Sequence, residues 1–196
     1  DNQFFAPDIG KRQTDKITIL FVSRLLARKG LQNLIPELPG IQAEVRRKSG
    51  REIQLVIVGD GPYRPVLEEM AAENKVQGFV HFEGGKNRDQ VRQYYQAADL
   101  FVLPSLAEGM PNVVLEAMAS GLPIVMTPCE GSKELVTDNG MIAPIKTLPD
   151  ALIHMCTDEE DRIAMGKNSL RRIETYFKWE SIGTRYLSML EESVGE

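Results

Sequence analysis

The chain has 196 residues, of which 42% are hydrophobic and 26% charged, and a formal net charge of -5. This length is typical of one domain, and the apolar content is sufficient for a core. The negative charge does not favour nucleic-acid binding. No apolar run approaches the roughly 20 residues of a membrane span. The two cysteines lack metal-type spacing and are expected to be reduced thiols of a cytoplasmic protein.

Strands and helices alternate along most of the chain. Five short apolar runs predict strands, at residues 17–22, 55–58, 79–82, 100–103 and 124–126. Helical periodicity appears between them, at residues 31–48 with a break near 39–40, 65–74, 89–97 and 112–120. A core-facing helical stripe is predicted for Val91, Tyr94, Tyr95 and Ala98. This pattern predicts an α/β fold, a Rossmann-like parallel sheet with helices on both faces.

The tail of the chain differs from the rest. Its helical patterns, at residues 151–156, 161–177 and 181–192, have no predicted strand between them. The middle helix is expected to direct one apolar face to the core, formed by Ile163, Leu170, Ile173 and Phe177. The acidic run at 158–161 stands at a helix start, where a capping role is expected.

Two glutamates surround a predicted turn and helix start. Glu108 precedes a glycine-containing turn, Pro111 and Asn112 are helix start signals, and Glu116 falls about one turn inside the helix. The first N–H groups of a helix are unpaired and favour an anion such as a pyrophosphate. The loop follows a predicted strand, at the edge where open α/β sheets bind ligands. The sequence therefore predicts a site for a phosphorylated sugar.

Three motifs resemble those of one enzyme family. The Glu108 to Glu116 spacing resembles the Glu-x7-Glu signature of the retaining GT-B glycosyltransferases of family four. Residues 23–30 resemble the family's Gly-Arg-Leu-x-x-x-Lys-Gly loop, with Ser23 where glycine is usual, and residues 59–62 resemble its Gly-x-Gly-Pro turn. The resemblance runs in the right order from about residue 16 to residue 179.

The resemblance implies transfer of a sugar from a UDP-type or GDP-type donor to an acceptor, with retention at the anomeric carbon, in polysaccharide or glycoconjugate synthesis. It assigns Arg24 and Lys29 to the diphosphate and Glu116 to the ribose hydroxyls. It assigns Glu108 to the donor sugar near the reacting carbon, either as a nucleophile or as electrostatic support. Backbone groups of six further residues are expected to contact the nucleotide sugar, namely Gly61, Gly109, Met110, Pro111, Asn112 and Val113.

The leaving nucleotide diphosphate carries growing negative charge that must be stabilised. The sequence contains no Asp-x-Asp triplet of the kind that commonly holds a divalent cation in other glycosyltransferases. Arg24 and Lys29 offer a guanidinium fork and a point charge in its place, and both are good phosphate ligands. We therefore expect a metal-independent site with no cofactor, in which the nucleotide sugar is a substrate.

The motifs also predict a domain organisation. Residues 1–15 are expected to be a linker-like segment, since 1–7 resemble the family's Asp-x-x-x-Phe-x-Pro sequence. Residues 16–176 form the nucleotide-sugar-binding domain, and 177–196, which begin with a Phe-x-Trp motif, form a crossover helix. The chain is then the carboxyl-terminal half of a two-domain enzyme whose partner is a missing amino-terminal acceptor domain. That domain would bind the acceptor and could associate peripherally with the inner face of the membrane.

Other functions remain as alternatives. A nicotinamide dehydrogenase is disfavoured because the turn at 59–64 lacks the third glycine of Gly-x-Gly-x-x-Gly. A sugar-nucleotide epimerase would share the fold, although the glutamate spacing favours transfer. A non-catalytic regulatory domain that binds a nucleotide sugar is the alternative outside the enzymes.

Overall fold

The computed structural model describes residues 4–7 and 15–177. The predicted crossover helix at 177–196 and the helix at 181–192 lie outside the described residues, apart from Phe177. The division into linker, donor domain and crossover helix therefore stays a prediction.

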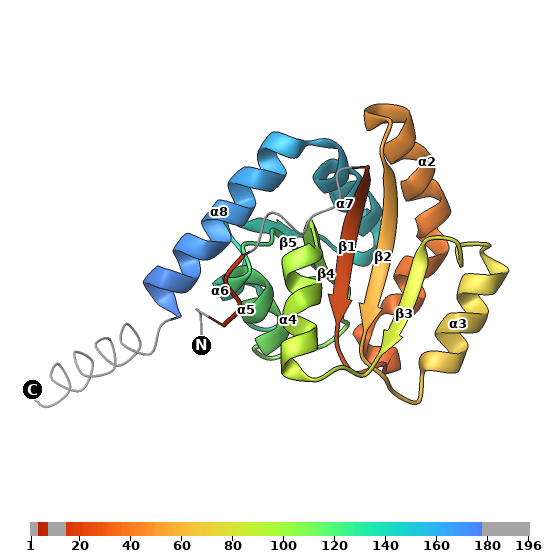
Figure 1. The fold of residues 1–196 in the computed structure, drawn as a ribbon, viewed down its shortest axis with the longest axis horizontal. Helices are drawn as coiled ribbons and strands as arrows, with labels where there is room; N and C mark the ends of the chain where they lie inside the picture. Colours follow the sequence, from red (N-terminus) through yellow and green to blue (C-terminus); the bar gives the residue numbers. More distant parts are fainter. Residues whose placement is uncertain (1–3, 8–14, 178–196) are drawn as a thin grey trace, which may run out of the picture.

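Six parallel strands form one sheet within the described residues, in the order β3-β2-β1-β4-β5-β6. Figure 1 labels β1 to β5 and shows helices packed around the sheet. Their bounds are β1 Lys16–Val22, β2 Glu52–Val58, β3 Val80–Gly84, β4 Leu100–Leu103, β5 Ile124–Met126 and β6 Gly140–Ile142. The order reverses direction between β1 and β4, as in a doubly wound sheet. The predicted Rossmann-like fold is confirmed.

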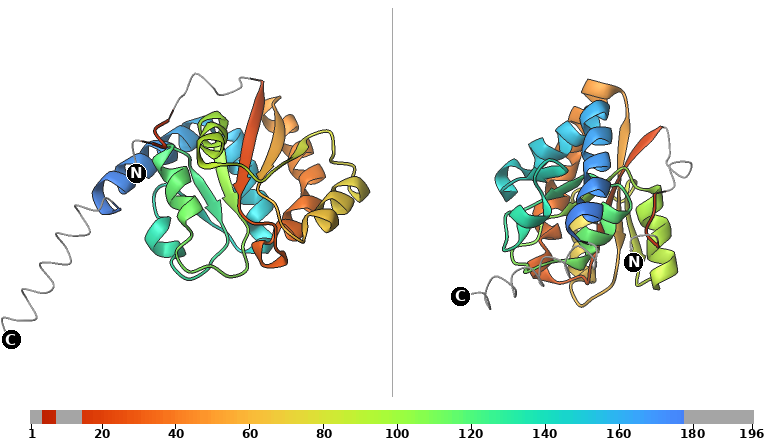
Figure 2. Two further views of the ribbon diagram at one scale, coloured as in Figure 1. Left: turned by 60° about the horizontal axis from the view of Figure 1, so that its bottom comes forward. Right: turned by 90° about the vertical axis from the view of Figure 1, so that its left-hand side faces the viewer.

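Helices cover both faces of this sheet. The bounds are α1 Leu31–Leu34, α2 Leu38–Ser49, α3 Arg64–Glu73, α4 Arg88–Ala97, α5 Asn112–Ala119, α6 Ser132–Leu135, α7 Leu148–Thr157 and α8 Glu159–Tyr176. Short 3-10 turns occupy 27–29, 35–37 and 145–147. Helix α2 packs on β2 and α7, whereas α4 packs on β1. The right-hand view of Figure 2 shows α4 on one side of the sheet and α2 with α7 on the other.

Strand β6 and the single turn of α6 are not among the elements predicted from sequence. Gly140 pairs with Ile124 of β5, and a Cβ atom at Gly140 would lie 2.0 Å from the Ile124 carbonyl oxygen. This glycine allows two strands to approach closely, although an Asn-Gly pair in sequence is a turn signal. Only Gly140 of β6 is fully buried, so no unbroken apolar run marks this strand, and the four residues of α6 are too few to show helical periodicity.

The break in the first helical segment was predicted at the wrong place. The chain leaves the α-helix at the 3-10 turn Ile35–Glu37 rather than near 39–40. Pro36 stands in the first turn of this 3-10 helix, and Pro39 stands in the first turn of α2. A proline at that position loses no hydrogen bond, because the first N–H groups of a helix have no partner within it.

The prediction for the buried face of α8 was wrong at Ile163, which is 45% exposed, and correct at Ile173, which is buried. The buried face instead includes Gly166, where a Cβ atom would lie 2.5 Å from the carbonyl oxygen of Gly121. Helix α8 therefore rests on small residues that allow close backbone approach, and apolar periodicity does not reveal such a face. Asp158 caps α8 by accepting a hydrogen bond from the backbone of Asp161, which confirms the capping role.

The described amino-terminal residues 4–7 pack onto α4. The Phe5 ring is buried and meets the Tyr95 ring edge-on at 5.6 Å between centroids. The side chain of Gln96 donates to the Ala6 carbonyl at 2.8 Å. Among the described residues, no helix has the length and apolar character needed to cross a bilayer.

Candidate functional site

The candidate site lies where β1 and β4 end, at the point where the strand order changes direction. Open α/β sheets bind ligands in the crevice outside the carboxyl ends of the strands at such a point. The loop at 23–30 follows β1, and the loop at 104–111 follows β4. These are the two loops that carry most of the predicted site residues. The topology therefore brings together segments that are far apart in the sequence.

Close backbone contacts hold the two loops against each other. The N–H of Leu106 donates to the carbonyl of Arg28 at 2.8 Å. Gly30 has a φ of +78°, and a Cβ atom there would lie 1.8 Å from the carbonyl oxygen of Pro104. Only glycine adopts this conformation without strain and leaves room for that carbonyl. Gly30 is therefore required for the loops to meet.

Lys29 and Glu108 form a buried ion pair across the two loops. The Lys29 ammonium donates to Oε1 of Glu108, and the two side chains are only 11% and 9% exposed. The Ser105 hydroxyl donates to the same carboxylate oxygen at 2.6 Å. An ammonium group has three N–H donors, of which this carboxylate takes one. The pair therefore fixes the position of Lys29 and leaves N–H donors for a ligand.

Glu116 lies on α5 and is held from α4. The Tyr95 hydroxyl lies 3.0 Å from Oε2 of Glu116 and 3.1 Å from the carbonyl oxygen of Val113. Burial raises the pKa of the Glu116 carboxyl above its ordinary value, and the hydrogen bond from Tyr95 opposes this shift. An ionised carboxylate accepts hydrogen bonds at both oxygens. Glu116 can therefore accept from ligand hydroxyls while Tyr95 holds it.

The start of α5 presents backbone donors without a side-chain cap. Pro111 is the N-cap and makes no side-chain cap bond, while the N–H of Val114 turns back to its carbonyl at 3.0 Å. The N–H groups of Asn112 and Val113 have no acceptor within the helix. Pro111 itself has no N–H, so the predicted role of this residue as a backbone donor is wrong. The backbone N–H groups that precede Pro111 are those of the exposed residues Gly109 and Met110.

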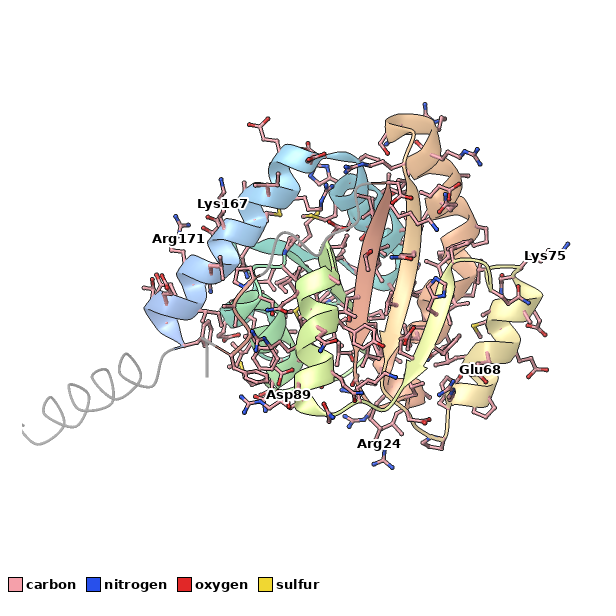
Figure 3. The ribbon with its side chains drawn as sticks, in the orientation of Figure 1. Arg24, Glu68, Lys75, Asp89, Lys167 and Arg171 are labelled. Atoms are coloured by element: carbon pink, nitrogen blue, oxygen red, sulfur yellow. The ribbon has the colours of Figure 1, made fainter. Side chains whose placement is uncertain are left out.

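Two predicted site residues stand apart from the ion pair. Arg24 is exposed and extends into solvent at the edge where β1 ends (Figure 3). A Cβ atom at Gly61 would lie 2.3 Å from the carbonyl oxygen of Leu25. The close approach that Gly61 allows is thus to the chain's own loop. It shapes the loop that carries Arg24 and Lys29.

Two residues of this arrangement, Ser105 and Tyr95, are not among the predicted site residues. Ser105 supports Glu108 from three residues before it, a spacing that the sequence does show. Tyr95 was assigned to the core stripe, and its ring is indeed buried. Its hydroxyl contact with Glu116 joins two helices and has no signal in the sequence.

One group of described residues has the spacing of a metal site. His154, Asp158 and Asp161 place ligand atoms within 4.8 Å of one another. They lie at the junction of α7 and α8, at the top of Figure 1, whereas β1 and β4 end at the bottom. Asp158 caps α8 and Asp161 contacts His154 at 2.9 Å, so the local structure already accounts for the group.

Comparisons with known proteins agree with this fold. The family model described as Glycosyl transferases group 1 matches residues 16–158. A relative from Mycobacterium tuberculosis, GDP-mannose-dependent alpha-(1-6)-phosphatidylinositol monomannoside mannosyltransferase, is 29% identical over 210 residues, which cover 97% of this chain and 53% of the relative. The chain thus spans about half the length of the curated relatives that it matches.

Solved structures share the fold. Sucrose-phosphate synthase from Thermosynechococcus elongatus superimposes with a TM-score of 0.81 at 24% identity, covering 100% of this chain and 51% of that one. The Anabaena protein HepE in complex with UDP gives a TM-score of 0.78 at 19% identity, covering 98% of this chain and 55% of its own. With the family model matching most of the sequence, from β1 to the start of α8, this chain belongs to the group 1 glycosyltransferases.

Proposed function

We propose that this chain carries the donor site of a glycosyltransferase that uses a GDP-type or UDP-type nucleotide sugar in glycoconjugate or polysaccharide synthesis. The observation that carries the proposal is the buried pair of Lys29 and Glu108 at the change of strand order, on the loops that lead from β1 and into α5. A GDP-mannose-dependent relative and a neighbour solved with UDP support this class of donor.

The leaving group decides what the site must supply. Cleavage of the glycosyl phosphate bond places growing negative charge on the nucleotide diphosphate, which the site must stabilise in the transition state. Lys29 stabilises this charge by donating hydrogen bonds through the N–H groups that Glu108 leaves free. The backbone N–H groups of Asn112 and Val113 donate further hydrogen bonds to the phosphates. Arg24 lies at the same edge of the sheet and supplies a second cation by turning toward the phosphates. In this proposal the diphosphate is bound without a divalent metal.

The two glutamates bind the other two parts of the nucleotide sugar, the ribose and the transferred sugar. Glu116 accepts hydrogen bonds from the ribose hydroxyls, while Glu108 lies against the donor sugar. Its carboxylate then stabilises positive charge on the anomeric carbon as an oxocarbenium-like state forms. Transfer proceeds with retention of configuration.

The remainder of the enzyme completes the reaction in this proposal. The relatives are about twice as long as this chain, which supports a second domain that binds the acceptor. Closure of that domain over the donor would exclude water and bring the acceptor to the anomeric carbon. This chain alone is then expected to bind donor without sustained transfer. Any membrane attachment of the enzyme would come through the acceptor domain.

Glutamine variants test the division of labour between the glutamates. Glu116→Gln should weaken free nucleotide diphosphate and nucleotide sugar alike, by about tenfold, because one charged acceptor is lost from the ribose. Glu108→Gln keeps a side-chain oxygen for the Lys29 ammonium, so it should weaken the nucleotide sugar clearly more than free nucleotide, which meets Glu108 only through Lys29. Calorimetric titration of each variant with both ligands measures the difference.

The exposed Glu134 on α6 provides a matched control. Glu134→Gln removes the same charge and should change neither affinity. Equal losses of both ligands in the Glu108 and Glu116 variants would show that the assignment of roles is wrong.

A further inference from the structure

We propose that Tyr95 is a positioning residue for the nucleotide, and that its hydroxyl fixes the Glu116 carboxylate in the orientation that accepts the ribose hydroxyls. This inference rests on the proposed function, because it concerns the same donor site. It adds a residue from α4, outside the motifs that the sequence analysis assigned to the site.

The ring of Tyr95 is held from several directions. Its exposure is 0%, and its centroid lies 5.6 Å from that of Phe5 and 6.0 Å from that of Phe101. The rings meet edge-on in the first case and tilted in the second, which are favourable aromatic arrangements. A phenylalanine would make the same ring contacts. The packing therefore accounts for an aromatic ring at this position but not for its hydroxyl.

The hydroxyl reaches the two parts of α5 that the proposed site uses. It lies 3.1 Å from the carbonyl of Val113, in the first turn, and 3.0 Å from Oε2 of Glu116. A phenol has a single proton to donate, and hydrogen bonds to an ionised acceptor are the stronger ones. The carboxylate therefore takes the larger share of this bond. Among residues 4–7 and 15–177, Tyr95 is the one residue that donates a hydrogen bond to the Glu116 carboxylate.

This geometry makes Tyr95 a brace for Glu116. A glutamate side chain has three rotatable bonds, and binding a vicinal diol requires both carboxylate oxygens to be aimed at it. One hydrogen bond from a ring that cannot move removes much of that freedom before the ligand arrives, and preorganisation of this kind increases affinity. Loss of the hydroxyl would leave the fold intact and the carboxylate free to rotate.

The test compares nucleotides with and without ribose hydroxyls. The wild-type chain and Tyr95→Phe are titrated with UDP and GDP, and with the 2′,3′-dideoxy form of whichever nucleotide binds. We expect Tyr95→Phe to weaken the ribonucleotide about tenfold, the effect of one hydrogen bond to a charged group, and to leave the dideoxynucleotide unchanged. A purely structural role for Tyr95 would weaken both ligands equally and would overturn the inference.

Two further variants sharpen this result. The double variant Tyr95→Phe with Glu116→Gln should bind no more weakly than Glu116→Gln alone, because Tyr95 acts through Glu116. Tyr94→Phe removes a comparable bond from the same helix, since the Tyr94 hydroxyl donates to Glu83 at 2.6 Å, and should leave the preference for ribonucleotide intact. An equal loss of preference in Tyr94→Phe would contradict a specific role for Tyr95.

The outcomes separate this inference from the proposed function. A wild-type chain that binds neither nucleotide would contradict the proposed donor site. A wild-type chain that prefers the ribonucleotide, with a Tyr95→Phe variant that keeps the full preference, would contradict only the role of Tyr95.

Discussion

Replacing Lys29 with alanine should weaken the binding of a nucleotide diphosphate by about 3 kcal/mol, the upper end of the range for a hydrogen bond to a charged group. Lys29 is the buried cation of the site, and Glu108 and the adjoining loop hold it in place. The variant also leaves the Glu108 carboxylate without its ionic partner. We therefore expect the free energy of unfolding to fall by about 2 to 3 kcal/mol, reduced by the hydrogen bond that Ser105 still donates. Calorimetric titration and urea unfolding measure the two effects.

Arg28→Ala is the matched control for Lys29. Arg28 belongs to the same 3-10 turn and carries the same charge, but its side chain is exposed. Its removal should change nucleotide affinity little. Adding Glu108→Gln to Lys29→Ala removes the unpaired charge and should restore part of the stability without restoring affinity. If Arg28→Ala loses as much affinity as Lys29→Ala, the general positive field of the loop binds the ligand and Lys29 has no special role.

Gly30→Ala should destabilise the chain by about 3 to 5 kcal/mol and abolish nucleotide binding. The methyl group would meet the Pro104 carbonyl oxygen, and alanine would be forced into a left-handed conformation with φ of +78°. Relief of the clash requires the loop after β1 to move away from the loop after β4. That movement separates Lys29 from Glu108. Chemical unfolding measures the loss of stability.

Gly50→Ala separates strain from steric clash. Gly50 has a similar φ of +71° at the end of α2, and a Cβ atom there would meet nothing within 4 Å. It should cost only about 1 kcal/mol, the penalty of the left-handed conformation, and should leave nucleotide binding unchanged. Similar losses in the two variants would mean that the contact between the loops contributes little.

The strands buried on both faces could be predicted from sequence because such burial demands unbroken apolar residues. The predicted bounds of β4 and β5, 100–103 and 124–126, are those of the structure. Strand β2 begins earlier than predicted, at Glu52, because its first residues alternate polar and apolar side chains. Strand β6 depends on a glycine that allows close approach to β5, and no apolar pattern marks such a contact.

Sequence motifs predict individual residues of the candidate site, but they do not predict the contacts between those residues. The motifs pointed to Lys29, Glu108 and Glu116 separately, because each stands at a characteristic spacing from a glycine or a helix start. The ion pair joins Lys29 to a residue 79 positions away, and only the order of the strands places the two loops together. The contact between Tyr95 and Glu116 depends on how α4 and α5 pack, which local sequence does not encode.

The most direct test of the donor site is a calorimetric titration of the wild-type chain with GDP-mannose and a panel of UDP-sugars in buffer that contains EDTA. The site described here predicts saturable binding of at least one nucleotide sugar at one site per chain, with the same affinity when Mg²⁺ replaces EDTA. The bound sugar nucleotide should also raise the unfolding temperature, by an amount that grows with the logarithm of its concentration relative to its Kd. Binding that is lost on chelation would contradict the metal-free site, and no binding by any donor of the panel would contradict the central claim.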